Sequence, residues 1–126
     1  MIEDINPPDV VAEVRDAFTR YNAAIETGDT DALNAFFWNS EHTARFGIGE
    51  HLFGFSEIAA FRTGTWKAGP PRKLDRLAIT ALGRDVAATS ALFKSATGKI
   101  TRQTQTWARF AEGWRIVAAH VSLLPD

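Results

Sequence analysis

Two side chains suited to a catalytic site lie in segments that should be buried on one side. Tyr21 belongs to a stripe of residues spaced three and four apart, which predicts an amphipathic helix ending near Gly28; the stripe also holds Val10, Val14, Ala17, Phe18 and Ile25. Arg45 lies among small and apolar neighbours in the alternating segment 42–48. A phenol can donate a proton, and a guanidinium can hold a carboxylate through two hydrogen bonds. The alternatives are a core tyrosine with its hydroxyl at the rim and a surface arginine of an edge strand.

Residues 100–124 alternate in type over two runs and predict a β-hairpin. With Glu112-Gly113 as a two-residue link, Gln105 faces His120 across the hairpin. One face is apolar near the link and polar at the far end, and it comprises Gln103, Gln105, Trp107, Trp114, Ile116, Ala118, His120 and Ser122. We therefore expect the polar end of this face, with Gln105, His120 and Ser122, to line a pocket.

The opposite face of this hairpin is apolar for a surface that should meet water. It comprises Thr104, Thr106, Ala108, Phe110, Val117, Ala119, Val121 and Leu123. This composition predicts a homodimer formed through the outer face of the sheet.

The segments before this hairpin predict further helices and strands. Residues 32–37 and a segment beginning at Ser56 predict two more helices, and residues 42–48 and 51–55 predict a short hairpin between them. With the first helix, this gives three helices in the N-terminal half of the chain.

Residues 74–82 and 86–96 alternate and predict two long strands. Two-residue turns at Arg84-Asp85 and Thr97-Gly98 join them to each other and to the last hairpin. In this register one row across four strands holds Ile79, Ser90, Gln105 and His120. The predicted fold class is α+β, with helices packed on the concave face of a strongly curved, mainly antiparallel sheet.

No nucleophile–base–acid triad can be assembled from these rows. Ser90, Ser122 and His120 share a face, but a residue of the intervening strand separates Ser90 from His120 and no acid completes the set. The other histidines, His42 and His51, show no metal-ligand spacing with a carboxylate, and the chain has no cysteine. The sequence therefore predicts no metal and no cofactor.

The remaining donors suit a small ligand that carries a carboxylate or ureido group. Arg45 would hold the carboxylate, and Tyr21 would donate to a developing oxyanion or protonate a leaving nitrogen. We expect substrate or water to be oriented by Gln105 and His120. Other side chains expected at this pocket are Arg62, Ser122, Trp38 and Trp66. The alternatives are a solvated helix arginine at position 62 and tryptophans that belong only to the core.

The chain has 126 residues, a net charge of -1, 45% hydrophobic residues and 23% charged residues, which predicts one globular domain spanning residues 1–126. Acidic and basic residues are interspersed, so the sequence predicts no nucleic-acid partner. It contains neither a signal-peptide pattern nor an apolar run of membrane-spanning length. We therefore expect a cytoplasmic protein without a membrane partner.

Several motifs resemble those of the nuclear-transport-factor-2-like (NTF2-like) superfamily, whose SnoaL-like members fold as a cone with a pocket. The motif GDTDALNAFF at residues 28–37 is similar to the second-helix motif of that superfamily. The segments ARFGIGEHLFGFSEIAAFR at 44–62 and RQTQTWARFAEGWRIVAAHVS at 102–122 resemble the AtzH-like family, which includes HpxZ-like proteins of oxalurate catabolism. The resemblance implies a cone-shaped fold with three N-terminal helices packed on the sheet.

The resemblance also implies a function and two site residues. A family member is assigned a decarboxylating amidohydrolase step on a small dicarboxylated urea, and the family's helix-1 tyrosine and strand arginine fall on Tyr21 and Arg45. The leading hypothesis is therefore hydrolysis, with decarboxylation, of a small ureido or amide carboxylate in nitrogen-compound catabolism. The alternatives are a non-catalytic ligand-binding accessory protein of an oxalurate or ureide pathway, and a subunit whose outer sheet face matters more than its pocket.

Overall fold

A computed structural model describes residues 1–125. Six strands form one curved sheet in the order β2-β1-β6-β5-β4-β3, and of the pairings between these six strands only that of β1 with β6 is parallel. The helices are α1 (Pro8–Thr27), α2 (Thr30–Ala35) and α3 (Phe55–Gly64). The strands are β1 (Ala44–Phe46), β2 (His51–Phe53), β3 (Arg72–Leu82), β4 (Val86–Ser95), β5 (Ile100–Phe110) and β6 (Gly113–Leu123). The predicted α+β class, with helices packed on a curved, mainly antiparallel sheet, is confirmed.

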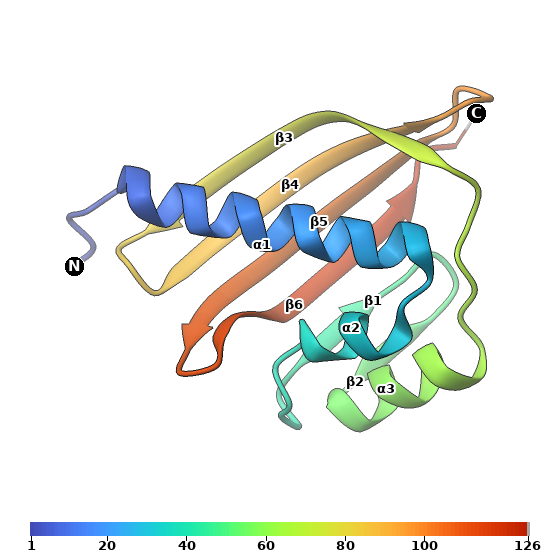
Figure 1. Cartoon of the computed structure of the whole chain (residues 1–126), viewed down its shortest axis with the longest axis horizontal. Coiled ribbons are helices and arrows are strands. Elements are labelled where there is room, and N and C mark those ends of the chain that lie inside the picture. Colours follow the sequence, from blue (N-terminus) through green and yellow to red (C-terminus); the bar gives the residue numbers. More distant parts are fainter. Residues whose placement is uncertain (126) are drawn as a thin grey trace.

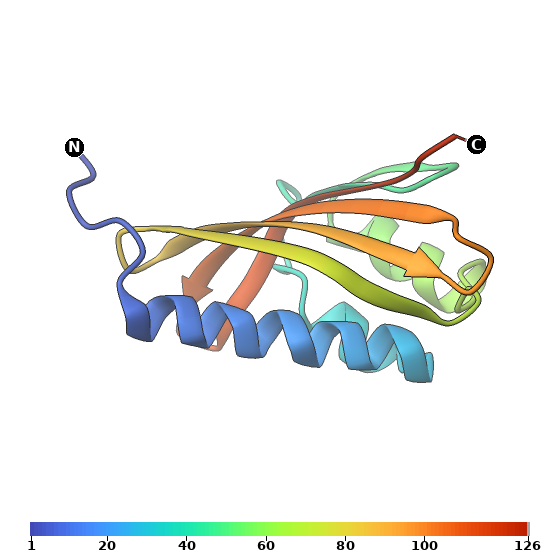
Figure 2. The ribbon, with the colours of Figure 1, turned by 90° about the horizontal axis from the view of Figure 1, so that it is seen from above.

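The long helix α1 crosses the face of the sheet, whereas α2 and α3 lie near β1 and β2 (Figure 1). Seen from above, α1 runs along one face of the sheet, which we call the inner face (Figure 2). The helix ends at Gly28, whose φ of 71° is a left-handed conformation that glycine adopts without steric cost. Its buried stripe matches the predicted spacing and comprises Val10, Val14, Ala17, Phe18, Tyr21 and Ala24.

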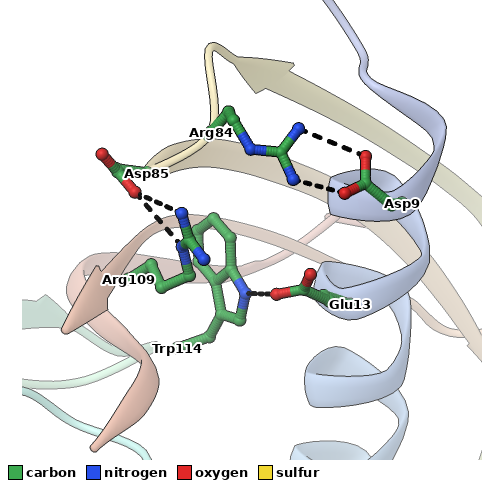
Figure 3. Close-up of polar contacts among 6 residues, drawn as sticks. All are labelled: Asp9, Glu13, Arg84, Asp85, Arg109 and Trp114. Atoms are coloured by element: carbon green, nitrogen blue, oxygen red, sulfur yellow. Dashed lines mark hydrogen bonds and ion pairs between the residues drawn. The ribbon is translucent and has the colours of Figure 1, made fainter. Parts of the chain in front are cut away.

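Polar contacts fix the N-terminal half of α1 on the end of the sheet that carries the β3–β4 turn and the start of β6 (Figure 3). Asp9 pairs with Arg84 in the turn between β3 and β4. Glu13 accepts a 3.0 Å hydrogen bond from the indole nitrogen of Trp114 at the start of β6. These contacts set the direction of the helix, so that its other end carries Tyr21 over the opposite end of the sheet. No helix within residues 1–125 is long and apolar enough to cross a membrane.

The predicted register of the β3–β6 meander is wrong by one residue at the first two hairpins, and at the last hairpin by two residues next to the link and by one farther along the strands. Leu82 pairs with Val86 and Lys94 pairs with Ile100, so both links are longer than two residues. Gly83 and Gly98 have φ values of 71° and 86°, which is the left-handed geometry that longer hairpin loops use. The predicted row of Ile79, Ser90, Gln105 and His120 is replaced by one that holds Ile79, Thr89, Gln105 and Ala119.

The last hairpin contains a β-bulge at Val117. The link is formed by residues 111–112, since Phe110 pairs with Gly113. Trp107 then pairs with Ile116, but the preceding residue of β5 pairs with Ala118, so Val117 is the extra residue. Beyond the bulge the side chains occupy the faces opposite to those predicted: the inner face takes Ala119 and Val121, and the outer face takes Ala118, His120 and Ser122.

Candidate functional site

A cavity of about 1380 Å³ lies between the C-terminal end of α1, α3, the segment 65–71 and the inner face of the sheet. Among the described residues that line it, seven are arginine or lysine and three are aspartate or glutamate, a surplus of four positive charges. The whole chain has a net charge of -1. A positive cavity in a slightly negative protein favours an anionic ligand.

Arg62 and Tyr21 form a buried hydrogen-bonded pair at this cavity. The Arg62 Nη2 atom donates to the Tyr21 hydroxyl oxygen at 3.0 Å. Only 2% of Arg62 is exposed, and its guanidinium carbon lies 5.0 Å from the ring centroid of Trp66. Burial lowers the pKa of the Arg62 guanidinium from its ordinary value. Its Nε has no hydrogen-bond partner among the described residues, and a buried unpaired donor costs about 1–3 kcal/mol.

Arg45 lies on β1, is 7% exposed, and forms an ion pair in which its Nη1 donates to Glu50 Oε1 at 2.6 Å. The guanidinium also lies 5.7 Å from the ring centroid of Phe61. Gly47 lies beneath this ion pair, because a Cβ at that position would be 1.7 Å from Glu50 Oε1. The β1–β2 connection therefore needs a glycine so that Glu50 can reach Arg45.

Arg72 enters the cavity at the start of β3. Leu74 pairs with Phe93 and Arg76 pairs with Leu92, so Asp75 is an extra residue, and this bulge puts Arg72 on the inner face. The Arg72 guanidinium carbon lies 3.8 Å from the Phe93 ring centroid. Burial lowers the pKa of this guanidinium from its ordinary value.

Gln103 lies beside Arg72 on the cavity wall and is 3% exposed. Its Oε1 accepts a 3.5 Å hydrogen bond from Arg72 Nη2. Its Nε2 has no acceptor within residues 1–125. The wall therefore presents a buried amide donor next to a positive charge.

The structure places four of the predicted site residues together. Tyr21, Arg45, Arg62 and Trp66 line the same cavity, from α1, β1, α3 and the segment after α3. For Arg62, the alternative of a solvated helix arginine is wrong. The roles of these side chains in binding or catalysis stay predictions.

Four other predicted site residues do not line this cavity. His120 and Ser122 lie on the outer face because of the bulge at Val117. Trp38 stacks on Phe110, with ring centroids 5.2 Å apart. Gln105 is on the inner face as predicted, but its Oε1 accepts a hydrogen bond from Thr89 within the buried layer beneath α1.

Sequence reasoning missed Arg72 and Glu50 and gave Gln103 no role. Gln103 shares the two-residue spacing of Gln105 and Trp107, which was a usable indication of its face. Counting alternate residues back from Ile79 places Arg72 on the outer face. Its position on the inner face can be predicted only if the bulge at Asp75 is known. Within the part of the chain that the structure describes, no three His, Asp or Glu side chains group as possible metal ligands.

The AtzH-like family model matches residues 3–126. A protein of unknown function from Pectobacterium atrosepticum is 46% identical, with a TM-score of 0.92 over 99% of this chain and 98% of that one. A cystatin-like fold protein from Burkholderia xenovorans is 43% identical, with a TM-score of 0.92 over 98% of both chains. An NTF2-like superfamily protein from Salmonella enterica is 26% identical, with a TM-score of 0.74 over 94% of this chain and 93% of that one.

No curated protein matches the sequence. The family match covers nearly the whole chain, and the similar solved structures carry NTF2-like and cystatin-like folds. The chain therefore belongs to the AtzH-like family, within the NTF2-like superfamily.

Proposed function

We propose that the chain hydrolyses a small ureido or amide carboxylate, with loss of CO₂, in nitrogen-compound catabolism. The observation that carries the proposal is the buried Arg62–Tyr21 hydrogen bond, which lies on the wall of a cavity with a surplus of positive charge. The family membership supports the same substrate class.

Arg45 is assigned to the substrate carboxylate. Its hydrogen bond to Glu50 uses a single guanidinium nitrogen, and a guanidinium can bond a carboxylate through two nitrogens at once. The Phe61 ring against Arg45 restricts the side chain and shields it from water. A substrate held at this position occupies the cavity that Tyr21 also lines.

Tyr21 is assigned as the proton donor. Its oxygen accepts from Arg62, so its own hydroxyl hydrogen remains available to the ligand. In the proposed reaction, water adds to the carbonyl carbon, the C–N bond breaks, and the leaving nitrogen takes a proton from Tyr21. When the other product is a carbamate, its nitrogen takes up a proton and its C–N bond breaks, which gives CO₂ and a free amine.

Glu50 is assigned as the acceptor of the proton from the attacking water. The carboxylates among the described lining residues are Glu26, Glu50 and Asp75. Of these, Glu50 is hydrogen-bonded to Arg45, the residue that we assign to the substrate. A general base must lie within hydrogen-bond reach of the water that it activates, and we place that water between Glu50 and the substrate carbonyl.

The test is turnover of ureido acids by the purified chain. N-carbamoylglycine and oxalurate are incubated with the wild type, Tyr21→Phe and the control Arg15→Gln, which changes an exposed residue on α1. We expect ammonia and CO₂ from at least one compound, with strong loss only in Tyr21→Phe. Binding without turnover would favour the accessory ligand-binding alternative and overturn the hydrolase.

We also propose that the chain forms a homodimer through the outer face of the sheet. That face carries the apolar or small side chains Phe46, Ala88, Leu92, Thr106, Ala108 and Ala118. Ala119 and Val121, which were predicted to belong to it, face inward instead. The cytoplasmic location and the single domain stay predictions.

A further inference from the structure

The ion pair between Arg45 and Glu50 joins a well-held side chain to a more mobile one. The Arg45 side chain is 8% exposed and its guanidinium packs against the Phe61 ring. The Glu50 side chain is 25% exposed and belongs to the link between β1 and β2. The backbone of this link is held separately, because the Gly47 N–H donates to the Glu50 carbonyl oxygen at 2.9 Å. The Glu50 side chain can therefore leave Arg45 by rotation alone, without any change in strand pairing.

Glu50 occupies one nitrogen of the guanidinium that we assign to the substrate carboxylate. Arg45 Nη1 donates to Glu50 Oε1, and the Gly49 N–H donates to Glu50 Oε2 at 3.2 Å. A ligand carboxylate that takes two guanidinium nitrogens forms a stronger pair than this contact through one nitrogen. Glu50 is exposed enough to be hydrated once it is released. The exchange of Glu50 for a ligand carboxylate is therefore favourable.

Gly47 makes the ion pair of the free protein sterically possible. A Cβ at this position would lie 1.7 Å from Glu50 Oε1 and 2.9 Å from Arg45 Nη1. The φ of Gly47 is not left-handed, so the backbone there accepts alanine. A Cβ on Gly49, in the same link, meets no atom of the described residues within 4 Å. Alanine at position 47 thus pushes Glu50 off Arg45, whereas alanine at position 49 adds the same methyl group without doing so.

We propose that the ligand carboxylate displaces Glu50 from Arg45, and that Gly47 is a positioning residue that lets Glu50 hold Arg45 until then. The proposal rests on the proposed function in one respect, that Arg45 binds the ligand carboxylate. In the free protein Glu50 is engaged by Arg45. Once released, it takes a proton from the attacking water while the water oxygen bonds to the substrate carbonyl carbon. The base is thus set free only when substrate is bound.

The first test uses butyrate, which has a carboxylate but no amide or ureido bond to hydrolyse. Calorimetric titration at fixed ionic strength compares the wild type with Gly47→Ala and the matched control Gly49→Ala. If Glu50 occupies Arg45 in about nine molecules of ten, it weakens the apparent affinity about tenfold. We expect Gly47→Ala to bind butyrate about tenfold more tightly and Gly49→Ala to stay within about twofold of the wild type. Equal affinities in the wild type and Gly47→Ala would overturn the exchange.

A second test follows the displacement itself. The Gly49 amide proton is hydrogen-bonded to the Glu50 carboxylate, so its chemical shift in a ¹⁵N–¹H correlation spectrum reports on the position of Glu50. We expect the Gly49 signal of the wild type to move upfield as butyrate is added, because this hydrogen bond is lost. In Gly47→Ala the signal should lie upfield already and move little. A wild-type signal that stays in place at saturating butyrate would show that Glu50 remains on Arg45, and would overturn the proposal.

The third test separates this role from a merely structural ion pair. With a ureido acid that the wild type hydrolyses, Gly47→Ala should lower KM about tenfold and keep kcat within about twofold, because Glu50 has left Arg45 in the reacting complex in either protein. A structural ion pair would instead show a lower melting temperature in Gly47→Ala and no fall in KM. That result would overturn the proposal.

Failure of the exchange and failure of the proposed function give different results. If Gly47→Ala tightens butyrate binding but no ureido acid is turned over, the exchange stands and the hydrolase is wrong. If ureido acids are turned over but Gly47→Ala changes neither butyrate affinity nor KM, only the exchange is wrong. If Arg45→Gln leaves butyrate binding intact, the assignment of Arg45 is wrong, and the exchange falls with it.

Discussion

The Arg62 guanidinium donates a 3.0 Å hydrogen bond to the Tyr21 hydroxyl, although the two residues are 41 positions apart in the chain. The bond joins α3 to α1 and fixes which way the hydroxyl points. Because the oxygen is already an acceptor, the hydroxyl hydrogen is directed to another partner. A tyrosine held by a neighbouring donor in a buried wall suits the stabilisation of charge that develops during a reaction.

Tyr21→Phe should lower turnover of the ureido substrate about a hundredfold while changing KM little, because the donor is used chiefly in the transition state. Steady-state kinetics measure the split between kcat and KM. Thermal unfolding serves as the structural control. A variant with unchanged kcat would show that the hydroxyl plays no part in the reaction.

Arg45→Lys should weaken substrate binding about tenfold or more, although the charge is kept. An ammonium group cannot form two parallel hydrogen bonds to one carboxylate, and it is too compact to pack on Phe61 as the guanidinium does. Titration calorimetry measures the loss. Arg15→Lys, at an exposed position on α1, is the control, and equal effects in the two variants would contradict a specific role for Arg45.

Glu50→Gln should separate binding from turnover. The substituted amide keeps the shape but accepts no proton from water, so we expect kcat to fall about a hundredfold. Substrate affinity should hold or increase, because Arg45 loses an internal carboxylate that competes for it. Equal losses of affinity and turnover would show instead that Glu50 only positions Arg45.

Ala88→Arg should dissociate the proposed homodimer, because it puts a charge into the centre of the outer face. Light scattering coupled to size exclusion measures the mass at micromolar concentration. Ala60→Arg, at an exposed position on α3, is the matched control and should leave the mass unchanged. A wild type that is monomeric under these conditions would rule out the dimer.

The Asp9–Arg84 contact predicts one component of acid sensitivity. The hydrogen bond from Arg84 lowers the pKa of the Asp9 carboxyl below its ordinary value of 3.8. The unfolded chain therefore takes up this proton at a higher pH than the folded chain does. The stabilisation is present above pH 3.8 and is lost as the pH falls below it. Unfolding measured from pH 6 to 2 should show a smaller acid dependence in Arg84→Gln than in the wild type; parallel curves would contradict the assignment.

The helices and the inner positions of β3 and β5 could be predicted because apolar spacing reports directly on burial. The stripe that contains Tyr21, and the alternation of Gln103, Gln105 and Trp107, are in the structure as the sequence indicates. The register could not be predicted, because two-residue and longer links both accept the glycines found at the turns. One residue of difference is enough to invert a face.

The two bulges, at Asp75 and Val117, determine which other side chains face the cavity. Nothing in the residue types marks Asp75 or Val117 as extra residues in their strands. Yet the first brings Arg72 into the cavity and the second removes His120 from it. The family resemblance identified Tyr21 and Arg45, which both line the cavity, because it depends on aligned motifs and needs no register.

The bulge at Val117 also has a consequence for how such a protein can change. Deleting that one codon would restore regular alternation along β6 while leaving both of its ends near their present neighbours. Because the bulge already absorbs the extra residue, Ala119 and Val121 would stay on the inner face and His120 and Ser122 on the outer face. The strand can therefore lose this one residue without any change in the cavity wall, whereas a regular strand that lost one residue would invert every position beyond it.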